Sequence, residues 1–217
     1  MAKAYHINSN LYHYGGNNPV RYVDPDGREI NDVDSNLIMK NANQEMLGFS
    51  NEPISEVGCV LTAYTRIANA IGGLEISLKE ANNTAKELGL YINKNELTPQ
   101  AGANLINELL HGTGKSVTYA GSVTAETMTE YGSFLNSLEN SHSELYVTAR
   151  IKTNDANNTK IYEHTVNINS NSVIAGDISD MNNALNFKVN DTSGVRTQIL
   201  NDKRFNSLYR IDYFRVN

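Results

Sequence analysis

The spacing of apolar residues changes once along this 217-residue chain, near residue 144, and that change limits the folds it can adopt. Before residue 144, apolar side chains recur every three or four positions, the period of a helix that buries one face. After it, they alternate with polar side chains, the period of a half-buried strand. Helices first and strands second, the strands joined by hairpin-length connections, predict an α+β fold with an antiparallel sheet.

Start and stop signals define the helices of the first half. A helix is expected to begin at Cys59 and to end at Gly72 and Gly73. Ser77 and Glu80 have the spacing of a capping box, which predicts a second helix. Two more helices are expected, one after Thr98-Pro99 and one after Thr124. The expected strands span residues 145–151, 160–168, 173–175, 186–191 and 208–216.

Composition and charge restrict the class of protein. The single cysteine excludes an internal disulfide and suits a reducing compartment. A net charge of -6 argues against nucleic acid as the main partner. No apolar run approaches the roughly 18 residues of a membrane span, and no signal-peptide core follows Met1. Histidine and cysteine residues do not cluster at metal-ligand spacing, so neither a metal nor another cofactor is expected.

Cys59 is the candidate nucleophile. It lies where a helix begins, so its sulfur is near unpaired backbone N–H groups and the positive end of the helix dipole. Both features lower the pKa of a thiol and favour the thiolate, which is the nucleophilic form. The alternative is that Cys59 is a small buried hydrophobic residue, the commonest role of a lone cysteine.

Two polar residues on expected strands extend this candidate site. Alternation places His164 on the same face of its strand as Val166, and it places Asp191 on one face of the following strand with Asn190 on the other. If the two strands are neighbours, Asp191 reaches the far nitrogen of His164, and Asn190 is the alternative orienting residue. Thiol catalysis needs such a nucleophile, base and orienting group, and the order Cys59, His164, Asp191 provides them.

The first part of the chain resembles a known family. Residues 10–27 include LYHYGGNNPVRYVDPDG, which resembles the closing motif of the RHS/YD-repeat associated core. In that family the motif ends the β-cocoon shell of polymorphic toxins, and a variable toxin domain follows it. The resemblance implies a shell motif of short β-hairpins at 1–30, a linker at 31–48 and a toxin domain at 49–217.

A second resemblance covers residues 49 to 191. The motifs are similar to those of papain-like, bacteriocin-processing cysteine peptidases. They are Gly58-Cys59-x-Leu61-Thr62-Ala63, Ile76-Ser77-x-x-Glu80-x-Asn82, His164-x-Val166-x-Ile168 and Val189-Asn190-Asp191. The resemblance implies a papain-like fold, with Cys59 as nucleophile, His164 as general base and acid, and Asp191 as the orienting residue.

The chain departs from that family at the oxyanion hole. The family has a glutamine about six residues before the cysteine, where it helps to bind the oxyanion. Pro53 stands at that position here. The backbone N–H of Cys59 is one candidate donor, and the side chain of Asn51 or Ser55 is the candidate second donor.

Together these observations predict a cysteine peptidase that is the toxin domain of an RHS-type polymorphic toxin. Its expected partners are a protein or peptide substrate and a cognate immunity protein. It is expected to be made in the bacterial cytoplasm without a signal peptide, exported as part of the toxin and active in the cytoplasm of the target cell.

Three alternatives remain open at this point. The same residues serve a glutamine deamidase or transglutaminase, because that chemistry also passes through a thioester. A catalytically inactive papain-like binding domain would keep the scaffold, with Cys59 as a core residue. The last alternative is a structural remnant of the shell.

Overall fold

The computed structural model describes residues 30–33, 36–139, 141, 143–154, 161–171, 187–193, 198–199 and 208–217. In this part of the chain, N-terminal helices pack on an antiparallel sheet, so the predicted α+β class is confirmed. The helices are η2 (a 3-10 helix, Met39–Ala42), α3 (Ile54–Val57), α4 (Cys59–Gly72), α5 (Leu78–Glu87), α6 (Pro99–Leu109) and α7 (Met128–Glu139). The predicted strand at 173–175 and the shell motif at 10–27 lie outside the described residues.

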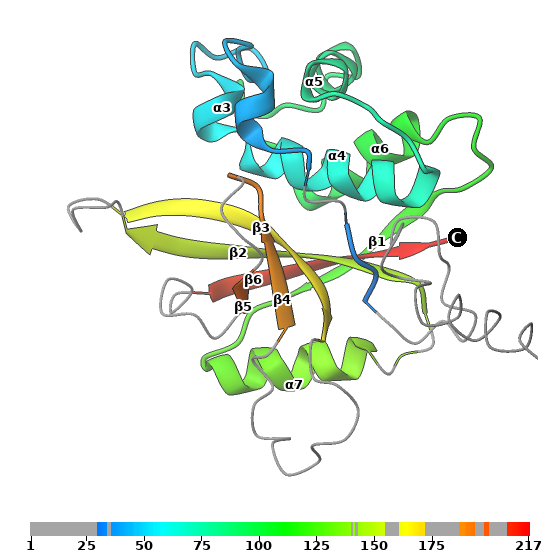
Figure 1. Ribbon diagram of the computed structural model, residues 1–217, viewed down its shortest axis with the longest axis vertical. Helices are drawn as coiled ribbons and strands as arrows, with labels where there is room; N and C mark the ends of the chain where they lie inside the picture. The colour runs from blue at the N-terminus through cyan, green and yellow to red at the C-terminus, as the bar shows by residue number, and fades with distance from the viewer. Residues whose placement is uncertain are drawn as a thin grey trace, which may run out of the picture.

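Helix α4 is the centre of the helical layer. It begins at Cys59 and ends at Gly72, as predicted, and Gly73 follows it in the left-handed conformation with φ 61°. Every residue from Leu61 to Ile71 is buried. A helix buried all round is surrounded by other elements, and α4 lies between the sheet and α5, with α6 beside it (Figure 1).

The predicted caps fix the starts of α5 and α6. Ser77 accepts a hydrogen bond from the N–H of Glu80, and the Glu80 carboxylate accepts one from the N–H of Ser77. This reciprocal capping box satisfies two N–H groups that the first turn leaves without partners. Thr98 caps α6 by accepting from the N–H of Ala101 at 3.1 Å, with Pro99 in the first helical position.

The sheet has the strand order β1-β6-β2-β3-β4-β5, and each neighbouring pair is antiparallel. The strands are β1 (Val117–Val123), β2 (Leu145–Asn154), β3 (Ile161–Asn171), β4 (Phe187–Asp191), β5 (Gln198–Ile199) and β6 (Leu208–Val216). Strands β2, β3, β4 and β6 were predicted from alternation, whereas β1 and β5 were not. The predicted neighbours β3 and β4 pair with Val166 opposite Asp191.

Two hydrophobic cores lie on opposite faces of this sheet. Helices α3 to α6 cover one face, and α7 covers the other (Figure 1). In β2, Tyr146 belongs to the first core and Val147 to the second, as alternation requires. The segment predicted as a linker contributes the buried side chains of Val33, Ala42 and Leu47 to the first core. Ile30, the last residue of the predicted shell motif, belongs to the second core. Among the described residues, no helix has the length and apolar character needed to cross a membrane.

Candidate active site

Cys59 is the first residue of α4, and the residue as a whole is half-buried. The short helix α3 ends just before it, and Gly58 donates its N–H to the carbonyl of Ile54 at 2.8 Å. The carbonyl of Gly58 then accepts both the N–H and the hydroxyl of Thr62, each at 2.9 Å. These bonds fix the start of α4 and direct its first-turn N–H groups toward the region around the sulfur.

Gly58 leaves no room for a side chain at this junction. A methyl group there would lie 2.4 Å from Cγ2 of Ile54 and 2.6 Å from its carbonyl oxygen. We expect Gly58→Ala to lower the free energy of unfolding by about 1–3 kcal/mol, because α3 and the start of α4 must separate. Chemical denaturation measures this loss, and we also expect the alkylation rate of Cys59 to change.

A matched control lies at the other end of the same helix. A methyl group on Gly73 meets no atom within 4 Å, but the backbone φ of 61° disfavours alanine. Gly73→Ala should therefore cost about 1 kcal/mol through the backbone and leave the alkylation rate of Cys59 unchanged. An equal alkylation rate in Gly58→Ala and wild type would contradict a role for this junction in placing the sulfur.

His164 and Asp191 meet where the pairing of β3 and β4 ends. Nε2 of His164 lies 2.7 Å from Oδ1 of Asp191. Asp191 faces Val166 in register, so His164 is its diagonal neighbour two residues along β3. The same Oδ1 accepts the N–H of Ser193 at 2.8 Å and its hydroxyl at 2.7 Å. These bonds hold the carboxylate of Asp191 against Nε2 of His164. The other ring nitrogen, Nδ1, is not used by Asp191.

The thiol of Cys59 contacts the same histidine. The imidazole of His164 hydrogen-bonds to the sulfur, and the backbone N–H and hydroxyl of Thr165 also donate to it. Thr165 is buried, and its carbonyl accepts the hydroxyl of Thr192 at 2.8 Å. The structure therefore brings Cys59, His164 and Asp191 together, from a helix and two strands that are far apart in sequence.

These contacts favour a thiolate and an imidazolium. Burial raises the pKa of Cys59, but the hydrogen bond and charge of His164 and the two bonds from Thr165 outweigh it, and the pKa falls below its ordinary value. Burial also opposes the charge on His164, but its bonds to Asp191 and Cys59 and their charges raise its pKa to about 10. Burial raises the pKa of Asp191, yet its bonds to His164 and Ser193 lower it overall.

Two other predicted residues have different surroundings. Asn190 is buried and donates its side-chain amide to the carbonyl of Val33 at 2.8 Å. Asp191, rather than Asn190, therefore occupies the hydrogen-bonding position at Nε2 of His164. Asn51 is exposed in the turn before α3, and Ser55 within α3 is partly buried. A role for either in an oxyanion hole stays a prediction.

A cavity of about 360 Å³ is lined by sequence neighbours of Cys59 and His164. Val60, which follows Cys59, lines it from α4, and Glu163, which precedes His164, lines it from β3. Leu61 and Leu97 add apolar walls, and Arg150 adds a cation. Cys59, His164 and Asp191 do not themselves line the cavity, which offers both apolar and charged groups to a bound side chain.

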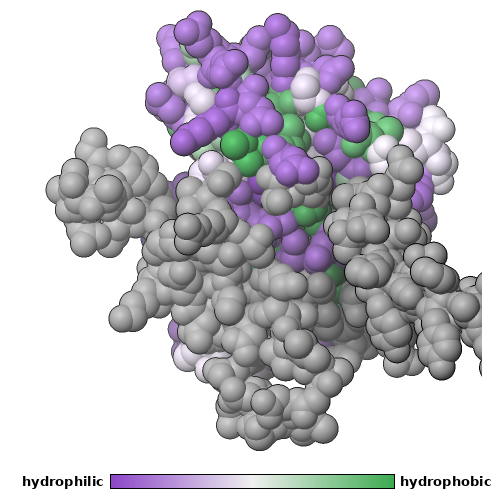
Figure 2. All heavy atoms as spheres, in the orientation of Figure 1, coloured by the Kyte–Doolittle hydropathy of each residue, from purple (hydrophilic) through white to green (hydrophobic). Residues whose placement is uncertain are grey.

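A second, larger groove lies on the other side of α4. Its volume is about 1500 Å³, and it runs between the 36–46 segment, α4 and the start of α5. Lys79 and Glu45, from opposite sides of this groove, form an ion pair at 2.8 Å. In Figure 2, this helical side of the molecule is largely hydrophilic, with hydrophobic atoms visible between the polar side chains.

Sequence reasoning missed Thr165, Thr192 and Arg66 around this site. Thr192 contacts Nε2 of His164 at 3.5 Å, and Arg66 bonds to the carbonyl of Asp191 at 3.1 Å. No motif identifies such residues, because each acts through hydrogen bonds that only the fold creates. Within the described ranges, no three His, Cys, Asp or Glu side chains converge as metal ligands would. No protein-family model matches the chain, and a search of curated proteins finds no match.

Proposed function

We propose that this domain is a cysteine hydrolase that acts on amide bonds, with Cys59 as nucleophile, His164 as general base and acid, and Asp191 as orienting residue. One observation carries the proposal: His164 hydrogen-bonds to the thiol of Cys59 and to the carboxylate of Asp191 at once. Thiol catalysis requires a nucleophile and a base in contact, with a third group that orients the base. The finer description as papain-like, with the nucleophile at a helix start and the base on a sheet, is part of this proposal.

The proposed reaction has two half-reactions. The Cys59 thiolate attacks the carbonyl carbon of an amide, and a C–S bond forms. The C–N bond breaks as the imidazolium of His164 gives its proton to the leaving amine, which produces a thioester. The neutral imidazole then takes a proton from water, the hydroxide attacks the thioester, and the C–S bond breaks to release a carboxylic acid and the thiolate.

Two further features support this reading. The backbone N–H of Cys59, the first residue of α4, is the candidate oxyanion donor. The cavity lined by Val60 and Glu163, the sequence neighbours of Cys59 and His164, is a candidate place for a substrate side chain. Either a peptide amine or ammonia can leave from such a site, so peptidase and glutamine deamidase activity are the two forms of the proposal.

The proposed biological role rests on the resemblance of residues 10–27 to RHS cores. A toxin domain that follows an RHS shell acts inside a target cell after export, and its producer needs an immunity protein that blocks the site. We expect that partner to cover Cys59 and the cavity lined by Val60 and Glu163.

The test is a comparison of proteomes. A bacterial lysate is incubated with the full chain, with Cys59→Ala, and with His111→Ala as a control that removes an exposed histidine. Mass spectrometry then measures new peptide N-termini and a mass increase of about one unit at glutamine, the change that deamidation produces. We expect one of these changes with wild type and His111→Ala and neither with Cys59→Ala.

The two positive outcomes distinguish the two forms of the proposal. New N-termini identify a peptidase, and modified glutamines identify a deamidase. Hydrolase activity would be rejected if wild type and Cys59→Ala gave identical proteomes, provided that the wild-type protein is folded and its thiol reacts with iodoacetamide. The binding-domain alternative would then be favoured.

A further inference from the structure

We propose that Arg66 is a positioning residue, whose guanidinium holds the end of β4 against α4 so that Asp191 stays within reach of His164. This inference rests on the proposed function, because it concerns the orienting residue of that site. It adds a fourth residue whose role no sequence motif indicates.

Arg66 is placed to connect the nucleophile with the orienting residue. It follows Cys59 by seven residues on α4, so the two lie on the same face of the helix about two turns apart. Its exposed fraction is 0%, and it is the largest fully buried side chain described. Nη1 donates to the carbonyl of Asn190 and Nη2 to that of Asp191, each at 3.1 Å.

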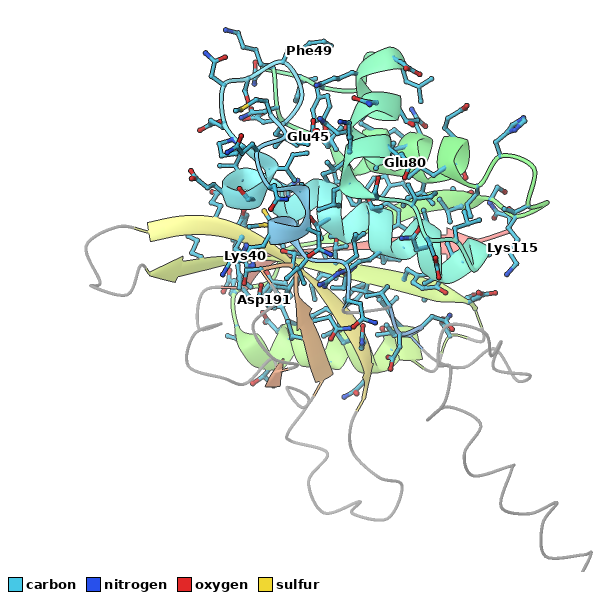
Figure 3. The ribbon with its side chains drawn as sticks, turned by 45° about the horizontal axis from the view of Figure 1, so that its top comes forward. Lys40, Glu45, Phe49, Glu80, Lys115 and Asp191 are labelled. Atoms are coloured by element: carbon cyan, nitrogen blue, oxygen red, sulfur yellow. The ribbon has the colours of Figure 1, made fainter. Side chains whose placement is uncertain are left out.

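A third bond from Arg66 fixes the segment before η2. Nε donates to the carbonyl of Leu37 at 2.7 Å. Met39, two residues after Leu37, donates its N–H to the carbonyl of Thr192 at 2.9 Å. Thr192 is the residue that directly follows Asp191. The guanidinium therefore links α4 to the segment before η2 and to the end of β4. The segment before η2 is also bonded directly to the chain that follows β4, through Met39. Figure 3 shows Asp191 at this end of β4, beneath the helical layer.

Only arginine has the geometry for this task. Its guanidinium presents five N–H donors in a fixed plane, so it can bond to consecutive carbonyls and to a third one from another side. A lysine ammonium keeps the charge but is a compact group on a flexible stem. A methionine keeps the apolar stem and removes the donor from the buried carbonyl of Asn190 and the partly buried carbonyls of Leu37 and Asp191, which favours movement of the end of β4 away from α4.

Movement of β4 would first affect His164. Nε2 of His164 bonds to Asp191, and the imidazole in turn bonds to the sulfur of Cys59. If Asp191 moves away, the charged imidazole loses its orienting carboxylate, and the pKa of the thiol rises. Each unit of increase lowers the thiolate fraction, and hence the alkylation rate, about tenfold at a pH below the pKa.

The experiment measures the rate of Cys59 alkylation by iodoacetamide as a function of pH in the full chain. We expect Arg66→Met to move the profile to higher pH and to slow the reaction at pH 6.5 by roughly tenfold, with Arg66→Lys between it and wild type. Lys115→Met is the matched control. Lys115 donates to the carbonyl of Ile71 at 2.7 Å, at the far end of α4 from the site (Figure 3). We expect this control to lower stability and to leave the profile unchanged.

Each outcome supports or overturns the inference. The inference is overturned if Arg66→Met folds and its alkylation rate depends on pH as in wild type. If Arg66→Met does not fold, an alkylation profile of Arg66→Lys that matches wild type overturns the inference instead. Failure of both variants to fold contradicts a role limited to positioning. Alkylation requires no substrate turnover, so a shifted profile in a protein that leaves the proteome unchanged would reject the proposed function and keep the role of Arg66.

Discussion

Replacing His164 with alanine should slow the alkylation of Cys59 at pH 6.5 by on the order of 10- to 100-fold. In the folded protein the imidazole is the largest of the influences that lower the pKa of this thiol, and burial acts in the opposite direction. Without the imidazole, burial raises the pKa toward or above the ordinary thiol value of 9.0. The nucleophilic thiolate then becomes a minor species at pH 6.5.

Iodoacetamide labelling followed by mass spectrometry measures this rate directly, since the chain has only one cysteine. Two groups act on the sulfur besides His164, namely the N–H and hydroxyl of Thr165, so we expect Thr165→Val to slow the reaction less than His164→Ala does. His111→Ala, which removes an exposed histidine, is the control and should react as wild type does. Equal rates at pH 6.5 in wild type and His164→Ala would mean that the imidazole does not ionise the thiol.

The helices were predictable because their signals are local. Gly73 stops α4 because its left-handed conformation suits glycine, and Ser77 and Glu80 start α5 through bonds within one turn. Such signals depend on neighbours in sequence, so they can be read without knowledge of the fold.

The strand β1 and the helix α3 were missed for the opposite reason. β1 contains Gly121 at a shift of register against β6, and its side chains are mostly half-exposed, so no clear alternation marks it. α3 is a single turn, in which Ile54 is the buried residue. Only pairing with the C-terminal strand β6 identifies β1 as part of the sheet.

The candidate site was predictable where alternation and register decide it. His164 and Asp191 belong to strands that a single sequence can align, and the observed register makes them diagonal neighbours. Alternation also groups His164 with Val166, but Val166 packs in the core beneath α7, on the face of the sheet opposite to Cys59. His164 nevertheless acts on the thiol, just beyond Val166 where the pairing with β4 ends, and no local pattern predicts where a strand pair ends.

The contact between Cys59 and His164 also predicts how stability depends on pH. The pKa of His164 is raised from its ordinary 6.5 to about 10, so its contribution is complete below pH 6.5 and is lost as the pH rises through about 10. The pKa of Cys59 is lowered from its ordinary 9.0, so its contribution is complete above pH 9.0 and is lost as the pH falls through the lowered value. The lowered pKa of Asp191 makes its contribution constant above its ordinary 3.8.

These two opposite slopes cancel in wild type. Where the folded thiol is ionised, between pH 6.5 and 9.0, the folded pair holds one proton on the imidazole and the unfolded chain holds one on the thiol. Since proton uptake is equal in the two states, we expect the pair to leave the free energy of unfolding constant over this interval. Above pH 9.0 the unfolded thiol loses its proton first, and stability should fall by about 1.4 kcal/mol per pH unit.

In Cys59→Ala only the histidine remains. Asp191 still favours the charged imidazole in the folded state, whereas the unfolded imidazole is neutral above pH 6.5, so stability should fall as the pH rises from 6.5. Urea unfolding between pH 6 and 9.5 measures both curves and stays below the range in which tyrosines ionise. The difference in stability between wild type and Cys59→Ala should therefore widen from pH 6.5 to 9.0, and the curve of His111→Ala should run parallel to wild type. Parallel curves for wild type and Cys59→Ala would mean that no proton moves from thiol to imidazole on folding, and the nucleophile would then have to be activated only when substrate binds.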